Sequence, residues 1–242
     1  MPTPEPSDDA QLPGRLASVA QRVAAAGTAS GRGPADVRLL LVTKTIEARR
    51  IRQVLSAGYT LIGENRAQEV VAKTDDLAAI PHEVHFIGHL QRNKINQVLP
   101  LVGCVQTVDS ADLGARLDRR SSAIGRTLDV LVQVNVSGEP TKSGAPLSEV
   151  PRLLADLAGC SALRVRGYMT IGLNSPDRSA VRAGYRALTE FRDDAQRRGL
   201  PGAADAVELS MGMSGDFEDA ITEGATMVRV GSAVFGRRPA AF

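Results

Sequence analysis

The strongest restriction on the fold is a repeat in which a short apolar run is followed by a segment with helical spacing. Eight such runs occur between Arg38 and Val230, roughly one every thirty residues. This alternation is typical of parallel strands joined by helices, and eight repeats without a change in composition indicate one closed barrel. A doubly wound sheet more often stops at five or six strands. We therefore expect an α/β fold with a single (β/α)8 TIM-type barrel. The expected strands are residues 38–44, 60–64, 83–88, 104–109, 128–135, 163–169, 206–211 and 227–230.

The segment before the first strand supplies one additional N-terminal helix. Residues 1–10 are rich in proline and aspartate, and we expect them to be disordered. Residues 11–27 carry Leu16, Val19 and Val23 at helical spacing and end on Gly27. No long helix follows the last strand, so the N-terminal helix is expected to cover that side of the barrel. Residues 11–242 then form one domain.

Composition and charge exclude several classes of protein. The chain has 242 residues, of which 43% are hydrophobic, enough to bury the core of one barrel. The net charge is +2 and the basic residues are spread along expected helices, which argues against a nucleic-acid groove. The N-terminus lacks the apolar core of a signal peptide, and no apolar run is long enough to span a bilayer. The two cysteines, Cys104 and Cys160, are far apart, as in a reducing compartment. We expect a cytoplasmic protein that binds neither nucleic acid nor membrane.

The first expected strand ends on a lysine, Lys44. Burying an ammonium group is costly unless the group is paired or neutral. A partly desolvated amine has a lowered pKa and is a better nucleophile, able to form an imine with an aldehyde or ketone. The alternative is that Lys44 extends from the strand end into solvent, and this segment alone does not decide between them.

The ends of the last two strands contain glycines and hydroxyl groups. The segment from Ser210 to Asp216 leaves the seventh strand, and Gly231 and Ser232 leave the eighth. Barrels of this class often bind phosphate in the loops after these strands, through backbone N–H groups and a helix N-terminus. The glycines and serines could also serve only as turns and helix caps. Their occurrence at both strands favours a phosphate site.

An arginine, Arg229, lies within the eighth strand and is expected to face the barrel interior, where it needs a partner. It could pair with an acid such as Glu64 or Glu208, or it could direct its guanidinium at a ligand bound next to the phosphate. A lysine that forms an imine, a phosphate site and an arginine together match the binding needs of pyridoxal 5′-phosphate (PLP).

Long motifs resemble one known family. They are Leu-Val-Thr-Lys44, Ile-Gly-Glu-Asn-Arg66, His-Phe-Ile-Gly-His-Leu-Gln-Arg-Asn-Lys94, Gln-Val-Asn-Val-Ser-Gly-Glu-Pro-Thr-Lys-Ser-Gly144, Leu-Ser-Met-Gly-Met-Ser-Gly-Asp216 and Val-Arg-Val-Gly-Ser-Ala-Val-Phe-Gly236. In this order, from about Gly14 to Arg237, the chain resembles the pyridoxal phosphate homeostasis proteins.

The resemblance implies an alanine-racemase-like N-terminal barrel and a set of cofactor-binding residues. In that family the lysine of the first strand carries PLP, which corresponds to Lys44. No catalytic residue and no metal ligand is implied. The remaining cofactor-binding residues implied by the resemblance are Asn65, Ser210, Met213, Ser214, Arg229, Gly231 and Ser232.

Three functions fit these observations. The first is a protein, expected to be a monomer, that stores PLP or delivers it to PLP-dependent apoenzymes and is not an enzyme. The second is a PLP-dependent amino-acid racemase of the single-barrel type. Racemases of the resembled fold add a C-terminal domain with a catalytic tyrosine, whereas Tyr59, Tyr168 and Tyr185 all lie within the expected barrel. The third is a class I aldolase-like barrel, although aldolase lysines usually lie on the sixth strand. We expect the first.

The three histidines, His82, His85 and His89, are close in sequence and could suggest a metal site. On one strand, His85 and His89 would lie roughly 13 Å apart, too far to bind one ion. We therefore expect no metal, and polar or packing roles for these side chains.

Overall fold

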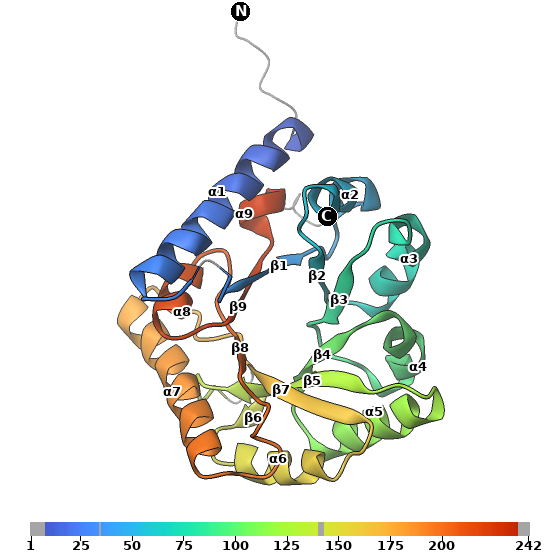
Figure 1. Ribbon diagram of the computed structural model, residues 1–242, viewed down its shortest axis with the longest axis vertical. Helices are drawn as coiled ribbons and strands as arrows, with labels where there is room; N and C mark the ends of the chain where they lie inside the picture. Colours follow the sequence, from blue (N-terminus) through green and yellow to red (C-terminus); the bar gives the residue numbers. More distant parts are fainter. Residues whose placement is uncertain (1–7, 34, 140–142, 237–242) are drawn as a thin grey trace, which may run out of the picture.

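The structure, a computed structural model, describes residues 8–33, 35–139 and 143–236. Eight parallel strands form a closed barrel surrounded by helices (Figure 1). The strands are β1 (Arg38–Val42), β2 (Leu61–Glu64), β3 (Glu83–Phe86), β4 (Cys104–Val108), β5 (Leu128–Asn135), β7 (Leu163–Met169), β8 (Glu208–Ser210) and β9 (Met227–Val230). The helices are α1 (Asp8–Ala29), α2 (Ala48–Ser56), α3 (Ala67–Leu77), α4 (Ile95–Val98), α5 (Ala111–Ala123), α6 (Val150–Ala158), α7 (Arg178–Arg197), α8 (Phe217–Thr222) and α9 (Ser232–Phe235).

The strands follow one another around the barrel in chain order, including the pair β4 and β5, and the ring closes where β9 pairs with β1. The expected (β/α)8 barrel is confirmed, and β5, β7 and β9 have the expected bounds. In the closing pair, Leu40 lies opposite Arg229. The first and last strands of the repeat are therefore direct neighbours.

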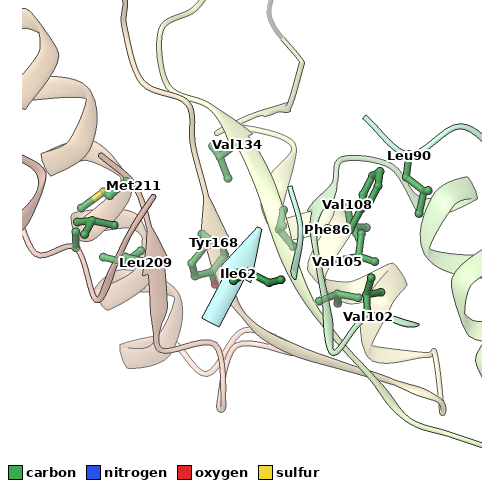
Figure 2. Packing of buried hydrophobic residues seen from close by; sticks show 14 of the residues in the cluster. Ile62, Phe86, Leu90, Val102, Val105, Val108, Val134, Tyr168, Leu209 and Met211 are labelled. Carbon is green, nitrogen blue, oxygen red and sulfur yellow. The ribbon is translucent and has the colours of Figure 1, made fainter. Parts of the chain in front are cut away.

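Both faces of the strands are buried, which explains why their sequences show no alternation. The larger core lies between the strands and the helices, and Figure 2 shows Ile62, Phe86 and Val105 within it. Inside the barrel, Leu40, Leu61 and Met227 form a smaller apolar cluster. Cys104, Leu131 and Met169 form another small apolar cluster, and buried polar side chains beside these clusters determine the chemistry described below.

The N-terminal helix covers the side of the barrel expected from the sequence. It packs against α8 and α9 (Figure 1), and Leu12, Leu16 and Val19 on its inner face are buried. The Arg15 Nε donates to the Val234 carbonyl oxygen of α9 at 2.8 Å. The helix begins at Asp8, so residues 8–10, which were expected to be disordered, are helical; residues 1–7 lie outside the described part of the chain.

Several boundaries differ from the sequence-based expectation. The first strand ends at Val42, two residues before Lys44, and β3 ends at Phe86, so His89 is not on a strand. The helical segment after β3 is divided into the 3-10 turn η1 (Arg92–Lys94), α4 and the 3-10 turn η2 (Leu99–Leu101). Pro100 within η2 has no N–H group and cannot continue an α-helix from α4. A two-residue strand that was not expected, β6 (Ala145–Pro146), pairs with the end of β5.

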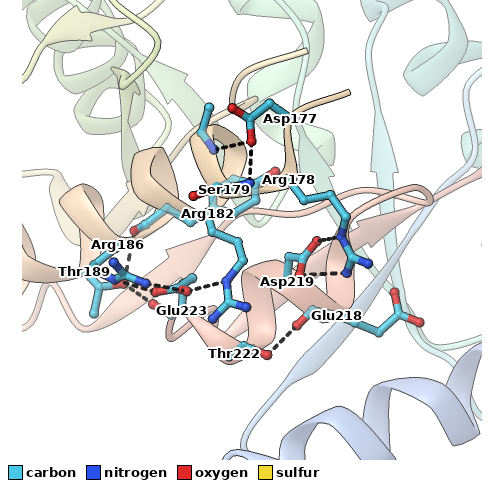
Figure 3. Close-up of polar contacts among 12 residues, drawn as sticks. Asp177, Arg178, Ser179, Arg182, Arg186, Thr189, Glu218, Asp219, Thr222 and Glu223 are labelled. Carbon is cyan, nitrogen blue, oxygen red and sulfur yellow. Dashed lines mark hydrogen bonds and ion pairs between the residues drawn. The ribbon is translucent and has the colours of Figure 1, made fainter. Parts of the chain in front are cut away.

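Helices α7 and α8 are joined by ion pairs (Figure 3). The Arg178 guanidinium contacts both carboxylate oxygens of Asp219 at 2.8 Å. Arg182 and Arg186 both contact Glu223, at 2.7 and 2.9 Å. These contacts hold α8 against α7, and they thereby also hold the segment that connects β8 to α8. In the described residues, no helix is both long and apolar enough to cross a membrane.

Candidate functional site

A cavity of about 230 Å³ opens where the carboxyl ends of β1 and β9 meet the segment that follows β8. This is the end of the barrel at which active sites of this fold lie. Six of the eight residues expected to bind a cofactor line it, and they come from three separate segments of the chain. The six are Lys44, Met213, Ser214, Arg229, Gly231 and Ser232.

Lys44 is half-buried and lies in a short turn after β1. The residue after it, Thr45, has a φ of 64°, the left-handed conformation that side chains with a branched Cβ rarely adopt. The Thr45 N–H donates to the Glu69 carboxylate at 2.5 Å. This hydrogen bond compensates for part of the backbone strain and holds the turn that carries the lysine.

The residue before Lys44 is held by a second set of contacts. The buried Thr43 hydroxyl donates to Glu64 at 2.7 Å, and the Lys73 ammonium donates to the Thr43 carbonyl oxygen at 2.9 Å. Lys73 also bridges Glu64 and Glu69, at 2.7 and 2.9 Å. Burial raises the pKa of Glu64, and the contacts with Lys73 and Thr43 offset only part of that rise. The backbone on both sides of Lys44 is therefore fixed from α3 and β2.

The opposite wall of the cavity presents hydrogen-bond donors. Backbone N–H groups of Gly231 and Ala233 both point at the Ser214 hydroxyl oxygen, each at 3.3 Å. Because that oxygen accepts both bonds, its own hydrogen can donate to a ligand, and the exposed Ser232 adds a second hydroxyl. The chain reaches this position by a sharp bend at Gly212, whose φ is 89° and where a Cβ would lie 2.5 Å from Ala220. Such a group of donors suits an anion.

Arg229 is buried and faces the barrel interior, as expected from the sequence. Its guanidinium donates to the Ser210 carbonyl oxygen at 2.7 Å, to the Ser210 hydroxyl at 3.0 Å and to the Thr170 carbonyl oxygen at 2.8 Å. Desolvation lowers its pKa to about 10, so the group remains a cation at neutral pH. The acids proposed as partners are engaged elsewhere, since Glu64 pairs with Lys73 and Glu208 pairs with Arg38.

Two expected site residues do not line this cavity. Ser210 is fully buried and contacts Arg229 from within the barrel. Asn65 lines a neighbouring cavity of about 620 Å³, together with Arg66, His89 and Lys94. Its Oδ1 atom is buried and has no hydrogen-bond partner among the described residues. Whether either residue touches a cofactor stays a prediction.

Sequence reasoning missed Gln106 in the barrel interior, and it expected only a polar or packing role for His85, which lies beside it. Gln106 and His85 are buried and bonded to each other, with 2.7 Å between Gln106 Nε2 and His85 Nδ1. The polarity of Gln106 within an apolar strand was the only available signal for that residue. The described residues contain no group of three or more histidine, cysteine or acidic side chains that could hold a metal ion.

The chain is similar to known proteins along nearly its whole length. Residues 15–239 match the family described as alanine racemase, N-terminal domain. The pyridoxal phosphate homeostasis protein of Pseudomonas aeruginosa is 41% identical over 223 residues, which cover 92% of this chain and 94% of that protein. The chain belongs to the pyridoxal phosphate homeostasis protein family.

Solved structures agree with this family assignment. A crystal structure of an unknown protein from Bifidobacterium adolescentis is 39% identical, and the match covers 96% of this chain and 97% of that chain with a TM-score of 0.89. A structure of PipY from Synechococcus elongatus with PLP bound is 32% identical and has a TM-score of 0.79. It covers 90% of this chain and 100% of the PipY chain. The barrel is thus shared along nearly its whole length with a protein of the same family that holds PLP.

Proposed function

We propose that this protein binds PLP at Lys44 and takes part in intracellular PLP homeostasis, storing the cofactor or delivering it to PLP-dependent apoenzymes. The observation that carries the proposal is the cavity that combines a lysine, an anion-binding group of donors and a buried arginine. The PLP-bound structure of PipY and the named function of the relatives support it. The two unpaired cysteines, Cys104 and Cys160, support the cytoplasm as the compartment.

The residues of the cavity fit the chemical groups of PLP. The amine of Lys44 suits the aldehyde, the donors around Ser214 and Ser232 suit the phosphate, and the guanidinium of Arg229 suits the pyridine nitrogen. When bound, PLP supplies an electron sink for reactions of amino acids. The strength of that sink depends on the protein group that faces the pyridine nitrogen.

Arg229, without a second base among the described residues of the cavity, favours a carrier over an enzyme. Strong carbanion chemistry on PLP needs a protonated pyridine nitrogen, which a carboxylate normally holds. A guanidinium gives up no proton, so a nitrogen facing Arg229 stays unprotonated and the sink is weak. In the described part of the chain, no tyrosine lines the cavity: Tyr168 and Tyr185 are both buried in the core. A racemase would need a second base at this position, and the proposed function is therefore binding without substantial turnover.

Covalent attachment can be tested by reduction. The purified protein should be yellow, and borohydride followed by peptide mapping should fix the label on Lys44. Lys44→Ala should lose the covalent cofactor and the visible absorbance band, because the remaining contacts hold PLP without an imine. Lys94→Ala, a change in the neighbouring cavity, is the matched control and should keep both. A label on Lys73, Lys94 or Lys142 would overturn the assignment.

Carrier and racemase differ in hydrogen exchange. Incubation of the protein with each enantiomer of alanine and serine in D2O should give only trace exchange of the α-hydrogen. Under the same conditions, loaded protein should restore activity to a PLP-dependent apoenzyme. Exchange at about 1 s⁻¹ or faster, in the range typical of enzymes, would support the racemase instead.

A further inference from the structure

A row of hydrogen bonds crosses the barrel interior from Arg229 to the opposite rim. The Arg229 guanidinium donates to the Ser210 hydroxyl at 3.0 Å, and that hydroxyl donates to Gln106 Oε1 at 2.7 Å. Gln106 Nε2 then contacts His85 Nδ1 at 2.7 Å, and His85 Nε2 contacts the Glu83 carboxylate at 2.8 Å. The row joins β9, β8, β4 and β3 and ends at the first residue of β3.

The direction of every hydrogen bond in this row is fixed from its acidic end. The hydrogen bond from His85 lowers the pKa of Glu83, which is therefore a carboxylate that can only accept. His85 must then donate from Nε2, and the Gln106 amide nitrogen, which can only donate, faces Nδ1 as the acceptor. The carbonyl oxygen of Gln106 is left to accept from Ser210, so the Ser210 hydroxyl hydrogen points away from Arg229.

The orientation of the Ser210 hydroxyl matters because, among the described residues, no carboxylate accepts a hydrogen bond from Arg229. Its contacts are two carbonyl oxygens and the lone pair of the Ser210 hydroxyl. If the hydroxyl were free to rotate, its hydrogen could face the guanidinium and one acceptor would be lost. The three contacts use three of the five N–H donors and leave two for the cavity that Arg229 lines.

We propose that Ser210, Gln106 and His85 are positioning residues that act through Arg229 and fix its free donors toward the pyridine nitrogen of the bound cofactor. The inference rests on the proposed function. Glu83, at the other end of the row, has a side chain that is 48% exposed, whereas the three positioning residues are nearly inaccessible. The row therefore links the cofactor end of the barrel to its amino-terminal rim.

The test compares PLP with 1-deazapyridoxal phosphate, in which a C–H group replaces the pyridine nitrogen. Dissociation constants of both are measured by absorbance titration of protein freed of cofactor. The native protein should bind PLP about 10-fold more tightly than the analogue, since only PLP accepts a charge-assisted hydrogen bond from Arg229. In Gln106→Leu this preference should fall to about 3-fold or less.

Matched variants distinguish a role in positioning Arg229 from a general effect on the fold. Gln133→Leu removes another buried barrel glutamine, bonded to the Ser143 carbonyl oxygen at 3.2 Å, and should keep the native preference. Ser210→Ala breaks the row next to Arg229 with a smaller change of volume and should also reduce the preference. If Gln106→Leu does not fold, the preference of Ser210→Ala for PLP over the analogue tests the inference instead. The double variant should be no worse than either single variant, because both interrupt the same row.

Three outcomes would overturn the inference. Equal losses of affinity for PLP and the analogue in Gln106→Leu and Ser210→Ala, with the 10-fold preference kept, would mean that these residues only support the fold. Native protein that binds both ligands equally would mean that Arg229 does not contact the pyridine nitrogen, although PLP binding itself would stand. Native protein that binds neither ligand would overturn the proposed function together with this inference.

Discussion

At the scale of single residues, two buried tyrosines differ in one hydrogen bond. The Tyr185 hydroxyl donates to Asp216 at 2.8 Å, whereas the Tyr168 hydroxyl has no partner among the described residues. Burial raises the pKa of Tyr168 to about 12. Tyr168→Phe should therefore raise the free energy of unfolding by about 1 kcal/mol, and Tyr185→Phe should lower it by about 1 kcal/mol. Urea unfolding measures both. Equal destabilisation in the two variants would show that the Tyr168 hydroxyl is satisfied in solution.

The two hydroxyls of the cavity allow a second prediction at this scale. Ser214→Ala with Ser232→Ala should weaken PLP binding by about 1–3 kcal/mol, because two charge-assisted hydrogen bonds to the phosphate are lost. Backbone N–H groups such as those of Gly231 and Ala233 remain, so binding should weaken rather than vanish. Fluorescence titration with PLP gives the affinity, and pyridoxal, which lacks the phosphate, is the control. An unchanged affinity for PLP in a folded double variant would show that the hydroxyls make no phosphate contact.

At the scale of elements, Glu223 connects α8 to two arginines of α7. Burial alone would raise its pKa, but hydrogen bonds from Arg186 and Arg182 outweigh burial and lower it. A carboxylate with a lowered folded pKa contributes stability above its unfolded pKa and loses it as pH falls through the folded value. Glu223→Gln should therefore lower the free energy of unfolding by about 1 kcal/mol at pH 7, with a smaller difference below about pH 4. Glu190→Gln, an exposed change on α7, is the control. A difference between Glu223→Gln and native protein that is constant with pH would contradict the ion-pair account.

Element positions also explain what the sequence could predict about the site. A residue at the carboxyl end of a strand must lie at the barrel mouth, which brought Lys44, Ser214 and Ser232 into the expected group. The same rule does not give the direction around the mouth, and Asn65 lines the neighbouring cavity. The partners of Arg229 could not be predicted from the sequence either. Its positive charge suggested acidic partners, whereas in the structure it donates to the carbonyl oxygens of Ser210 and Thr170.

At the scale of the whole molecule, local periodicity predicted the barrel because each strand and helix buries its own apolar residues. Contacts across the interior have no such local pattern. Gln106 and Ser210 lie far apart in sequence and on strands that are not paired, yet their side chains meet at 2.7 Å. The left-handed conformation of Thr45 could not be predicted from the sequence for a similar reason, because the carboxylate that accepts from its N–H group belongs to Glu69 on α3.

The closure of β9 onto β1 has a consequence for synthesis of the protein. Every described residue that lines the cavity belongs either to residues 42–46 or to residues 213–236. Roughly 10 to 30 s of translation separate these two segments on the ribosome. A nascent or proteolysed chain that stops before β9 keeps Lys44 and Ser214 but lacks the Arg229 guanidinium and the Ser232 hydroxyl. At the proposed site, cofactor loading is therefore expected only after the last strand has emerged, because the cavity wall opposite Lys44 forms only then.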